Sequence, residues 1–284
     1  MSPWYLYDEL IKEASNILSP NTNKLLSVDN PAIIKEICLG INWSYLSAGF
    51  LTEKYDLRVS NFFSQQGIFF SPKNIARTLP WSGSLINSPI QQYFTSIKSW
   101  EWAEATVGAL AINTVINSRS TLLNNAENID GSQSIPGNLT VFKHFLPQLH
   151  GKQVSVIGRY PGLEILLKQN DINPELWTII EKNPQGNDYP DVAAYYYLSE
   201  SDWVFITASS IVNKTLPMLL QCCKDANVVL MGPSLPWSTV WKKLGVNYLA
   251  GVEVLSLSGL KEVVMQAGGT QLFEGAVVYK ILAL

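Results

Sequence analysis

The residues best suited to bind a ligand lie in the second half of the chain, where a short apolar segment meets a turn. Val154 to Ile157 is mostly β-branched, Gly158 follows it, and Pro161-Gly162 precedes a stretch of helical composition. Glycine lets a ligand approach the backbone closely, and proline suits the first position of a helix. The first amides of a helix are unpaired and can hold an anion. The pattern predicts a parallel strand, a tight turn and a helix start, and the alternative is an ordinary turn that binds nothing.

Further apolar segments in this half of the chain are each followed by polar residues. These segments span residues 177–181, 203–207, 227–231 and, as the last predicted strand, 248–254, and stretches of helical pattern lie between them. Such alternation predicts a Rossmann-like parallel sheet that is buried on both faces. Ligands of such sheets bind outside the carboxyl ends of the strands. We therefore expect one ligand-binding edge that contains Gly158, Arg159, Pro161, Gly162, Asn183, Thr207, Asn213, Thr215, Gly232, Pro233 and Ser234.

Two carboxylates are the candidate general acid and base. Glu181 ends the second predicted strand, about twenty residues after Gly158, where an acid often accepts a hydrogen bond from ribose. Glu104 and Asn113 lie in a predicted helix over residues 101–116 that is apolar nearly all round, so both side chains need partners. Glu104 and Glu181 are the predicted catalytic residues, and Asn113 is a predicted ligand-binding residue. Taken singly, each of these polar residues has an alternative role as a cap, turn or surface residue.

Several common kinds of site are absent from the sequence. The chain has neither the G-x-G-x-x-G pattern of dinucleotide-binding proteins nor a P-loop. Its two histidines, His144 and His150, do not share a helical face, and the adjacent Cys222 and Cys223 suit a buried structural role. No nucleophile elbow or Ser-His-Asp order is visible. We therefore predict no metal bound directly by protein side chains, and the cofactor stays unknown.

Composition and charge narrow the classes of partner. The chain has 284 residues, of which 47% are hydrophobic, and a formal net charge of −3. These values are typical of one or two globular domains and argue against general disorder. The sequence has no basic block of the kind that binds nucleic acid, and no apolar run reaches the roughly 18 residues of a membrane helix. Three cysteines are too few for a disulfide framework, so we expect a cytoplasmic protein. The expected partner is a small molecule, with no nucleic acid and no membrane, and a homo-oligomer is left open.

The first half of the chain has a different pattern. Residues 5–18 have apolar positions at helical spacing, and residues 33–50 contain two β-rich stretches that suit a hairpin. The stretch 124–138 is rich in Asn, Ser and Gly and is typical of a linker. We therefore predict a smaller α+β domain over residues 1–134 and a Rossmann-like α/β domain over residues 135–284.

Five stretches, taken together and in order, resemble one family. They are Val154 to Gly162, Ile180 to Gly186, Asp202 to Thr207, Val212 to Thr215, and Met231 to Pro236. Together they are similar to the Putative heavy-metal chelation family, also called domain of unknown function 364. In the first half, Glu104 to Asn113 is similar to a helix of that family's partner domain, which resembles the N-terminal domain of enolase.

The resemblance covers nearly the whole chain. It implies an enolase N-terminal-like α+β domain followed by a Rossmann-like domain, with a small-molecule site in the cleft between them. It also implies a role in condensing or hydrolysing flavin-, pterin- or siderophore-like compounds linked to heavy-metal chelation. The alternatives are a non-catalytic protein that binds a metal–chelate complex and a methyltransferase-like binder of S-adenosylmethionine. Three residues depart from the family pattern, because Ala208 and Lys214 stand where glycines are expected and Arg159 stands where histidine is common. These changes move the site toward positive charge.

Overall fold

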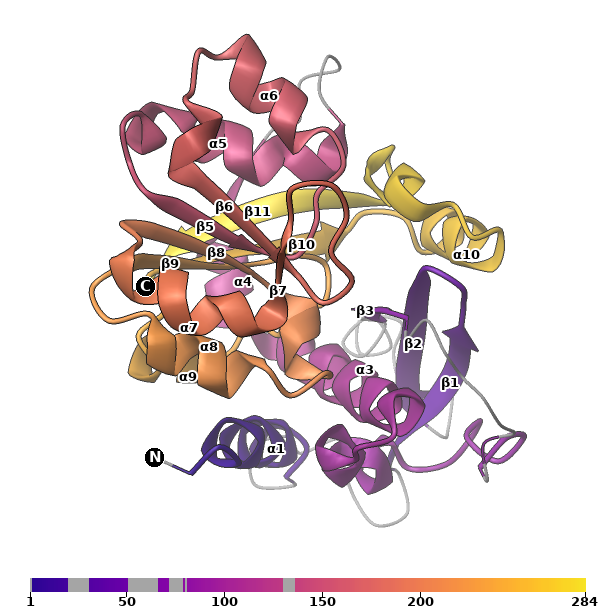
Figure 1. Ribbon diagram of the computed structural model, residues 1–284. Helices are drawn as coiled ribbons and strands as arrows, with labels where there is room; N and C mark the ends of the chain where they lie inside the picture. The colour runs from indigo at the N-terminus through magenta and orange to yellow at the C-terminus, as the bar shows by residue number, and fades with distance from the viewer. Residues whose placement is uncertain (1, 20–30, 51–65, 72–78, 80, 130–135) are drawn as a thin grey trace. The chain divides into compact units, whose positions relative to one another are not determined.

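The computed structural model describes most of the chain as two units. The described residues are 2–19, 31–50, 66–71, 79, 81–129 and 136–284. By their contacts, residues 1–124, 236–240 and 254–277 group into a first unit, and residues 125–235, 241–253 and 278–284 group into a second. Figure 1 shows the elements of both units. The domains 1–134 and 135–284 stay a prediction, and the contacts add two late segments to the first unit.

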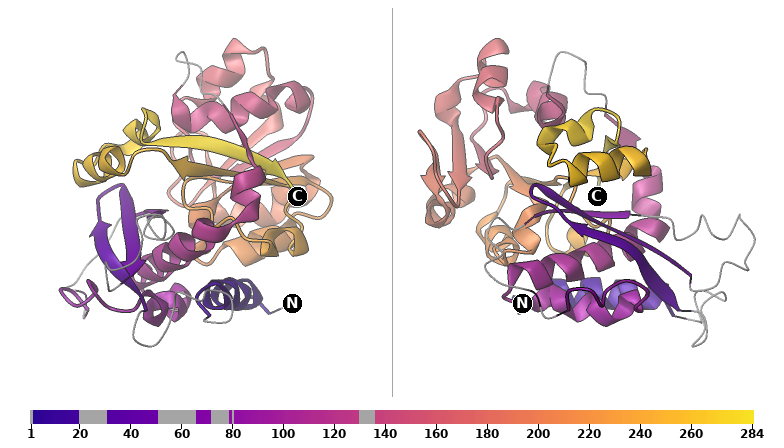
Figure 2. Two further views of the ribbon diagram at one scale, coloured as in Figure 1. Left: turned by 180° about the vertical axis from the view of Figure 1, so that it is seen from behind. Right: turned by 90° about the vertical axis from the view of Figure 1, so that its right-hand side faces the viewer.

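The first unit is built on a three-stranded antiparallel sheet in the order β1-β2-β3. The helix α3 lies against β2 and β3 (Figure 2), and most of its residues are buried, as its apolar pattern predicts. The predicted N-terminal helix and hairpin are confirmed. The elements are α1 (Tyr5–Ile17), β1 (Ala32–Leu39), β2 (Trp43–Phe50), β3 (Gln66–Phe70), the 3₁₀ helix η2 (Ile90–Lys98), α3 (Trp102–Arg119) and α4 (Thr121–Asn125).

Two glycines let other backbones come very close to α3. A Cβ atom on Gly108 would lie 2.1 Å from the backbone nitrogen of Ile97 in η2. A Cβ atom on Gly67 of β3 would lie 2.4 Å from the carbonyl oxygen of Leu110. Real Cβ atoms do not approach backbone atoms to such distances, so the packing of this unit requires glycine at both positions.

A helical segment from late in the chain belongs to the first unit. The helix α10 (Leu257–Met265) packs against β2. Asn42 donates a hydrogen bond to the carbonyl of Ala267 at 2.8 Å, and the indole of Trp43 donates to the carbonyl of Gly269 at 2.8 Å. The loop between β1 and β2 is therefore fixed by residues that are far away in the sequence.

The second unit contains most of an eight-stranded sheet in the order β4-β11-β10-β9-β8-β5-β6-β7. The six strands from β7 to β10 pair in parallel, which confirms the predicted α/β class. Helices α5 and α6 cover one face of the sheet and α7 and α8 cover the other (Figure 1). The strands are β4 (Glu127–Asn128), β5 (Val154–Ile157), β6 (Trp177–Glu181), β7 (Tyr189–Pro190), β8 (Trp203–Thr207), β9 (Asn227–Met231), β10 (Tyr248–Val254) and β11 (Val277–Ala283). The helices named here are α5 (Thr140–Leu149), α6 (Leu163–Gln169), α7 (Ala194–Tyr197) and α8 (Leu216–Cys222), and the short α9 (Val240–Lys243) precedes β10.

Aromatic side chains form the centre of the core in the second unit. Phe205 of β8 is fully buried, and its ring centroid lies 5.0 Å from that of Phe142 and 5.7 Å from that of Phe145, both on α5. β8 pairs with β5 on one side and with β9 on the other. This packing therefore fixes the position of Thr207, the last residue of the strand.

Two predictions about the ends of the second unit need correction. The strand over residues 248–254 is not the last, because β11 follows it and continues the sheet. The stretch 124–138 is not wholly a linker, because β4 pairs with β11 in antiparallel fashion. Residues 130–135 of that stretch lie outside the described residues.

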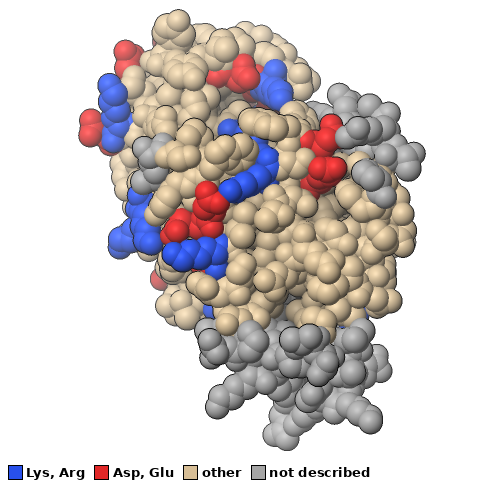
Figure 3. Space-filling model, turned by 90° about the horizontal axis from the view of Figure 1, so that it is seen from below, with Lys and Arg blue, Asp and Glu red and all other residues tan. Residues whose placement is uncertain are grey.

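On the face shown in Figure 3, Lys and Arg side chains lie beside Asp and Glu rather than in a field of one sign. Among the helices that the structure describes, none is both long and apolar enough to cross a membrane.

Candidate functional site

The candidate site lies where the strand order of the parallel sheet reverses. The chain leaves β5 for its neighbour β6, and later it crosses to β8 on the other side of β5. Ile157 pairs with both Ile180 and Ile206, so the residues that follow β5, β6 and β8 lie along one edge. Ligands of doubly wound sheets bind at such a switch point. The edge and its flanking loops carry the residues predicted from the second half of the sequence, which are Gly158, Arg159, Pro161, Gly162, Glu181, Asn183, Thr207, Asn213, Thr215, Gly232, Pro233 and Ser234.

Tyr160 fills the space directly above Gly158. Gly158 has φ of 104°, and a Cβ atom there would lie 3.3 Å from Cγ2 of Thr207 and 3.7 Å from Cε2 of Tyr160. The side chains of Tyr160 and Thr207 form a hydrogen bond, and burial raises the pKa of the Tyr160 hydroxyl. The ring of Phe142 packs against Tyr160 edge to face at 5.0 Å. In dinucleotide-binding proteins the glycines of this turn leave room for a pyrophosphate, whereas here an aromatic ring packs beside the first glycine.

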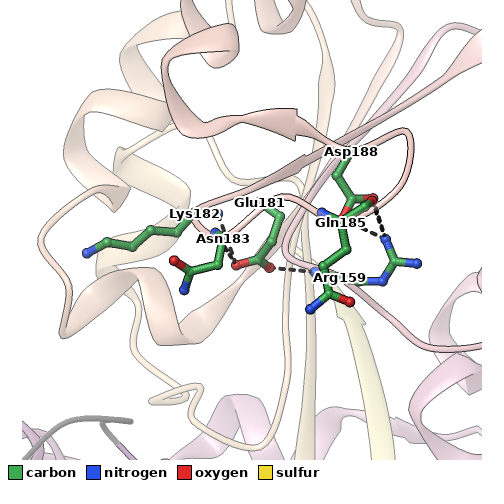
Figure 4. A network of polar contacts seen from close by, with 6 residues as sticks. All are labelled: Arg159, Glu181, Lys182, Asn183, Gln185 and Asp188. Carbon is green, nitrogen blue, oxygen red and sulfur yellow. Dashed lines mark hydrogen bonds and ion pairs between the residues drawn. The ribbon is translucent and has the colours of Figure 1, made fainter.

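The carboxylate of Glu181 joins the turns that follow β5 and β6 (Figure 4). Its Oε2 accepts a hydrogen bond from the backbone nitrogen of Arg159 at 2.9 Å. Its Oε1 accepts from the backbone nitrogens of Lys182 at 2.9 Å and Asn183 at 3.4 Å. Three backbone amides thus hold this carboxylate in place. This arrangement favours a positioning role over proton transfer, and the catalytic role of Glu181 stays a prediction.

Arg159 connects the turn after β5 with the loop that follows β6. Its Nη1 donates to both carboxylate oxygens of Asp188 at 2.6 Å and to the carbonyl of Gln185 at 3.0 Å. The Asp188 side chain is only 2% exposed and also accepts from the backbone nitrogen of Gln185 at 3.0 Å. The hydrogen bond to Asp188 raises the pKa of Arg159 above its usual value. In Figure 4 the other terminal nitrogen of the guanidinium points away from the residues drawn.

We expect the Asp188→Asn variant to loosen the loop over residues 182–188. An amide cannot accept the paired hydrogen bonds of the Arg159 guanidinium as a carboxylate does. Backbone amide exchange, followed by mass spectrometry on peptides from this loop, should therefore become faster. The Asp191→Asn variant, which changes an exposed acid just outside the loop, is the control and should leave the exchange unchanged. Equal exchange in the Asp188→Asn variant and the unaltered protein would show that the ion pair does not order the loop.

The loop after β8 contains a dense set of short hydrogen bonds. Thr207 Oγ1 lies 3.0 Å from the hydroxyl of Ser209, and Ser210 Oγ donates to the carbonyl of Thr207 at 2.6 Å. Asn213 Oδ1 accepts from the backbone nitrogen of Thr215 at 3.1 Å and from its hydroxyl at 2.7 Å. These bonds give Thr207, Asn213 and Thr215 a local structural role, and they also fix the position of the residue between Asn213 and Thr215.

That residue is Lys214, which sequence reasoning did not include in the site. Its φ is 68°, in the left-handed region that favours glycine. This conformation gives a physical reason for the glycine expected at this position from the family resemblance. The Lys214 ammonium donates to the carbonyl of Val212 at 2.8 Å, and burial lowers the pKa of Lys214 to about 8. The signal available in the sequence was a lysine in place of glycine within an Asn-Lys-Thr turn.

The two predicted site residues of the first half lie in the first unit. Ser99 Oγ donates to Oε2 of Glu104 at 2.7 Å and accepts from the backbone nitrogen of Glu101 at 3.1 Å, which stabilises the start of α3. The buried amide of Asn113 lies 3.4 Å from the carbonyl of Ile68 in β3. Both side chains thus have structural partners, and their roles in catalysis and ligand binding stay predictions.

His, Cys, Asp and Glu side chains form no preformed metal-binding cluster in the described part of the chain. Across these residues, no three His, Cys, Asp or Glu side chains gather closely enough to hold a metal ion. A heavy metal that reached the switch point would therefore need ligands beyond those side chains.

One protein sequence and one solved structure are each similar to most of this chain. An uncharacterized protein of Methanocaldococcus jannaschii is 24% identical over 198 residues, which are 67% of this chain and 70% of that protein. A crystal structure of a protein of unknown function from Desulfitobacterium hafniense DCB-2, of the domain of unknown function 364 family, has a TM-score of 0.76 and 25% identity. It covers 99% of this chain and 98% of its own.

A second solved structure shows the same fold. It is a protein of unknown function of the same family from Pyrococcus horikoshii, with a TM-score of 0.70, 20% identity and coverage of 98% of this chain and 100% of its own. The domain of unknown function 364 family, described as Putative heavy-metal chelation, matches residues 140–283, which is just over half of the chain. The chain therefore belongs to the domain of unknown function 364 family.

Proposed function

We propose that the second unit binds a small anionic metabolite at the switch point and that Lys214 supplies the positive charge that recognises it. Ligands of the proposed class are flavin phosphates, pterin carboxylates and catecholate chelates of heavy metals. In this proposal a heavy metal arrives already bound to its chelator, so no set of protein ligands is needed. The observation that carries the proposal is the backbone and burial of Lys214.

The conformation of Lys214 is costly to the folded protein. A residue other than glycine in the left-handed region loses about 1–2 kcal/mol relative to a helical or extended conformation. Burial of the amine adds a second cost, which its lowered pKa reports. Glycine would avoid both costs, which supports a role for the lysine side chain beyond its hydrogen bond to Val212. Strained residues with shifted pKa values are enriched at functional sites, and Lys214 lies in the loop that follows β8, one of the two strands at the switch point.

The proposal favours binding over acid–base catalysis. The two predicted catalytic residues, Glu104 and Glu181, are both held by local hydrogen bonds. The aromatic ring of Tyr160 above Gly158 argues for a ligand that lies beside the turn rather than one that threads over it as a dinucleotide does. A condensing or hydrolysing activity, as the family resemblance implies, would use this binding site, but binding is the part that the geometry of the unit supports.

Two replacements of Lys214 are expected to separate binding from stability. Lys214→Gly should abolish binding of flavin mononucleotide and yet raise the free energy of unfolding by about 1 kcal/mol, because it removes backbone strain. Lys214→Met should abolish binding while it retains the strain. Binding is measured by isothermal titration with flavin mononucleotide, 6-carboxypterin and ferric 2,3-dihydroxybenzoate as probes, and stability is measured by urea unfolding.

The control is Lys168→Met, which removes an exposed lysine from α6 and should leave both measurements unchanged. If the unaltered protein binds none of the three probes, or if the Lys214→Met variant binds as tightly as the unaltered protein, the proposal is wrong. A loss of stability in the Lys214→Gly variant would show that the lysine has a structural role.

Binding of an anionic probe should weaken as the pH rises through about 8. Lys214 loses its proton in this range because burial lowers its pKa to about 8, while the phosphate of flavin mononucleotide keeps its charge above its second pKa of about 6. The sign for stability is opposite. Below pH 8 the amine is protonated in both the folded and the unfolded protein. Between pH 8 and the ordinary pKa of lysine, the unfolded protein keeps this proton while the folded protein has lost it. The contribution of Lys214 to the free energy of unfolding therefore rises with pH in this range. Titrations from pH 7 to about 9.5 test the affinity, and the Lys214→Met variant should lack this pH dependence.

A further inference from the structure

Two sulfur-containing side chains are in contact at the end of α8, and a second cysteine follows them in the chain. The Sγ atom of Cys222 lies 3.8 Å from the Sδ atom of Met218, one helical turn earlier. Cys223 follows the last helical residue with φ of −83° and ψ of 90°, and its Sγ lies 3.2 Å from the carbonyl oxygen of Leu219. All three sulfur residues are partly exposed. The group thus combines two thiols and a thioether at a place that solutes can reach.

The two thiols are poorly placed for a disulfide with each other. Neighbouring Cα atoms across a trans peptide are about 3.8 Å apart, which is shorter than the usual separation of about 4.4–6.8 Å in disulfides. Cys222 and Cys223 are both unpaired thiols in the structure. Burial raises the pKa of both, and that of Cys223 to about 12, so they react slowly with oxidants and keep their protons until something displaces them.

We propose that Met218, Cys222 and Cys223 form a binding site for a soft monovalent metal ion such as Cu(I). Thiolates and thioethers are the ligands that soft ions prefer. On binding, each thiol releases its proton to water and forms a sulfur–metal bond, so two protons leave as one ion enters, and the oxidation state of the metal does not change. The backbone nitrogen and the Sγ of Cys223 both contact the carbonyl oxygen of Leu219, so in this proposal the Cys223 side chain rotates away from that carbonyl when it binds the metal.

This site is separate from the switch point. α8 leads from the loop after β8, at the carboxyl edge, to the segment that precedes β9. Because β8 and β9 are parallel, the end of α8 lies toward the amino edge of the sheet, opposite the loop of Lys214. The metal proposal and the anion proposal can therefore fail independently.

A competition experiment tests the site in the full chain. Reduced protein is titrated without oxygen into the coloured complex of Cu(I) with bathocuproine disulfonate, and the loss of colour reports the copper taken by the protein. We expect one Cu(I) per chain. The Cys222→Ser and Cys223→Ser variants should each weaken binding by about 100-fold and Met218→Leu by about 10-fold, because each removes one soft ligand.

Cys38→Ser is the matched control, since Cys38 lies on β1 of the first unit and should not contribute. Met218→Leu nearly conserves volume and is expected to stay folded, so it tests the site even if a serine variant is unstable. Thermal melts identify any unfolded variant. Failure of the unaltered protein to take copper from the competitor would overturn the proposal. So would unchanged affinity in the Met218→Leu and cysteine variants, or loss of the bound ion in the Cys38→Ser variant.

Discussion

The Gly108→Ala variant is expected to lose about 3 kcal/mol of stability, although alanine is the better helix former. At most helical positions this replacement stabilises a protein by roughly 1 kcal/mol. Here the new Cβ atom would lie 2.1 Å from the backbone nitrogen of Ile97. A backbone atom cannot swing aside as a side chain does, so η2 must move away from α3 and the buried side chains between them lose contact.

Gly259→Ala is the matched control for this prediction. Gly259 lies in the first turn of α10, and its added Cβ would meet side-chain atoms alone, the nearest being Oγ of Ser256 at 3.2 Å and Cβ of Ala276 at 3.8 Å. Its stability should change by less than about 1 kcal/mol. Urea unfolding followed by far-ultraviolet circular dichroism measures both variants, and hydrogen exchange locates the loss in the first unit. Equal stabilities for the two variants would mean that η2 and α3 are not packed as closely as described.

The Phe205→Ala variant is expected to lose about 4 kcal/mol, the largest effect of any change considered. Phe205 is fully buried in the middle of the parallel sheet, and its ring packs against those of Phe142, Phe145 and Trp203. Removal of the ring leaves a cavity that strands paired on both sides of β8 cannot close. Urea unfolding measures the loss, and exchange of β5, β8 and β9 amides should show that it falls on the second unit.

The Phe205→Leu variant shows how the loss of stability depends on the volume that the side chain fills. Leucine keeps part of the apolar contact, so this variant should lose roughly half as much stability as Phe205→Ala. If the alanine variant were as stable as the leucine variant, the aromatic cluster would not be the centre of this core.

Strands buried on both faces were the elements that the sequence predicted best. A continuous apolar run can be recognised from neighbouring residues alone, and such runs form β5, β6, β8 and β9. β7 has only two residues, and β4 is equally short, so neither has a local pattern. β11 was missed although its β-prone residues alternate between buried and half-buried positions, whereas its pairing with β4, about 150 residues earlier, leaves no local signal.

The position of the candidate site followed from topology, but its contents did not. A parallel sheet with reversed strand order places its ligand edge by a general rule, so the turns at Gly158 and Thr207 could be predicted. The roles of Tyr160 and Asp188 depend on tertiary contacts, because one covers Gly158 and the other binds Arg159 across two loops. The hydrogen bonds that engage Glu181 depend on the same contacts, and residue type alone does not reveal them.

The grouping of residues 254–277 with the first unit has a consequence for biosynthesis. The loop between β1 and β2 leaves the ribosome early, whereas its partners Ala267 and Gly269 follow 225 and 226 residues after the side chains that they bind. During most of translation the first unit therefore lacks part of its surface and must wait while the whole parallel sheet is synthesised. A fragment cut at residue 134 would keep the same gap permanently. The nascent chain thus has a stage in which the hairpin is exposed, and at this stage a holding chaperone would be of most use.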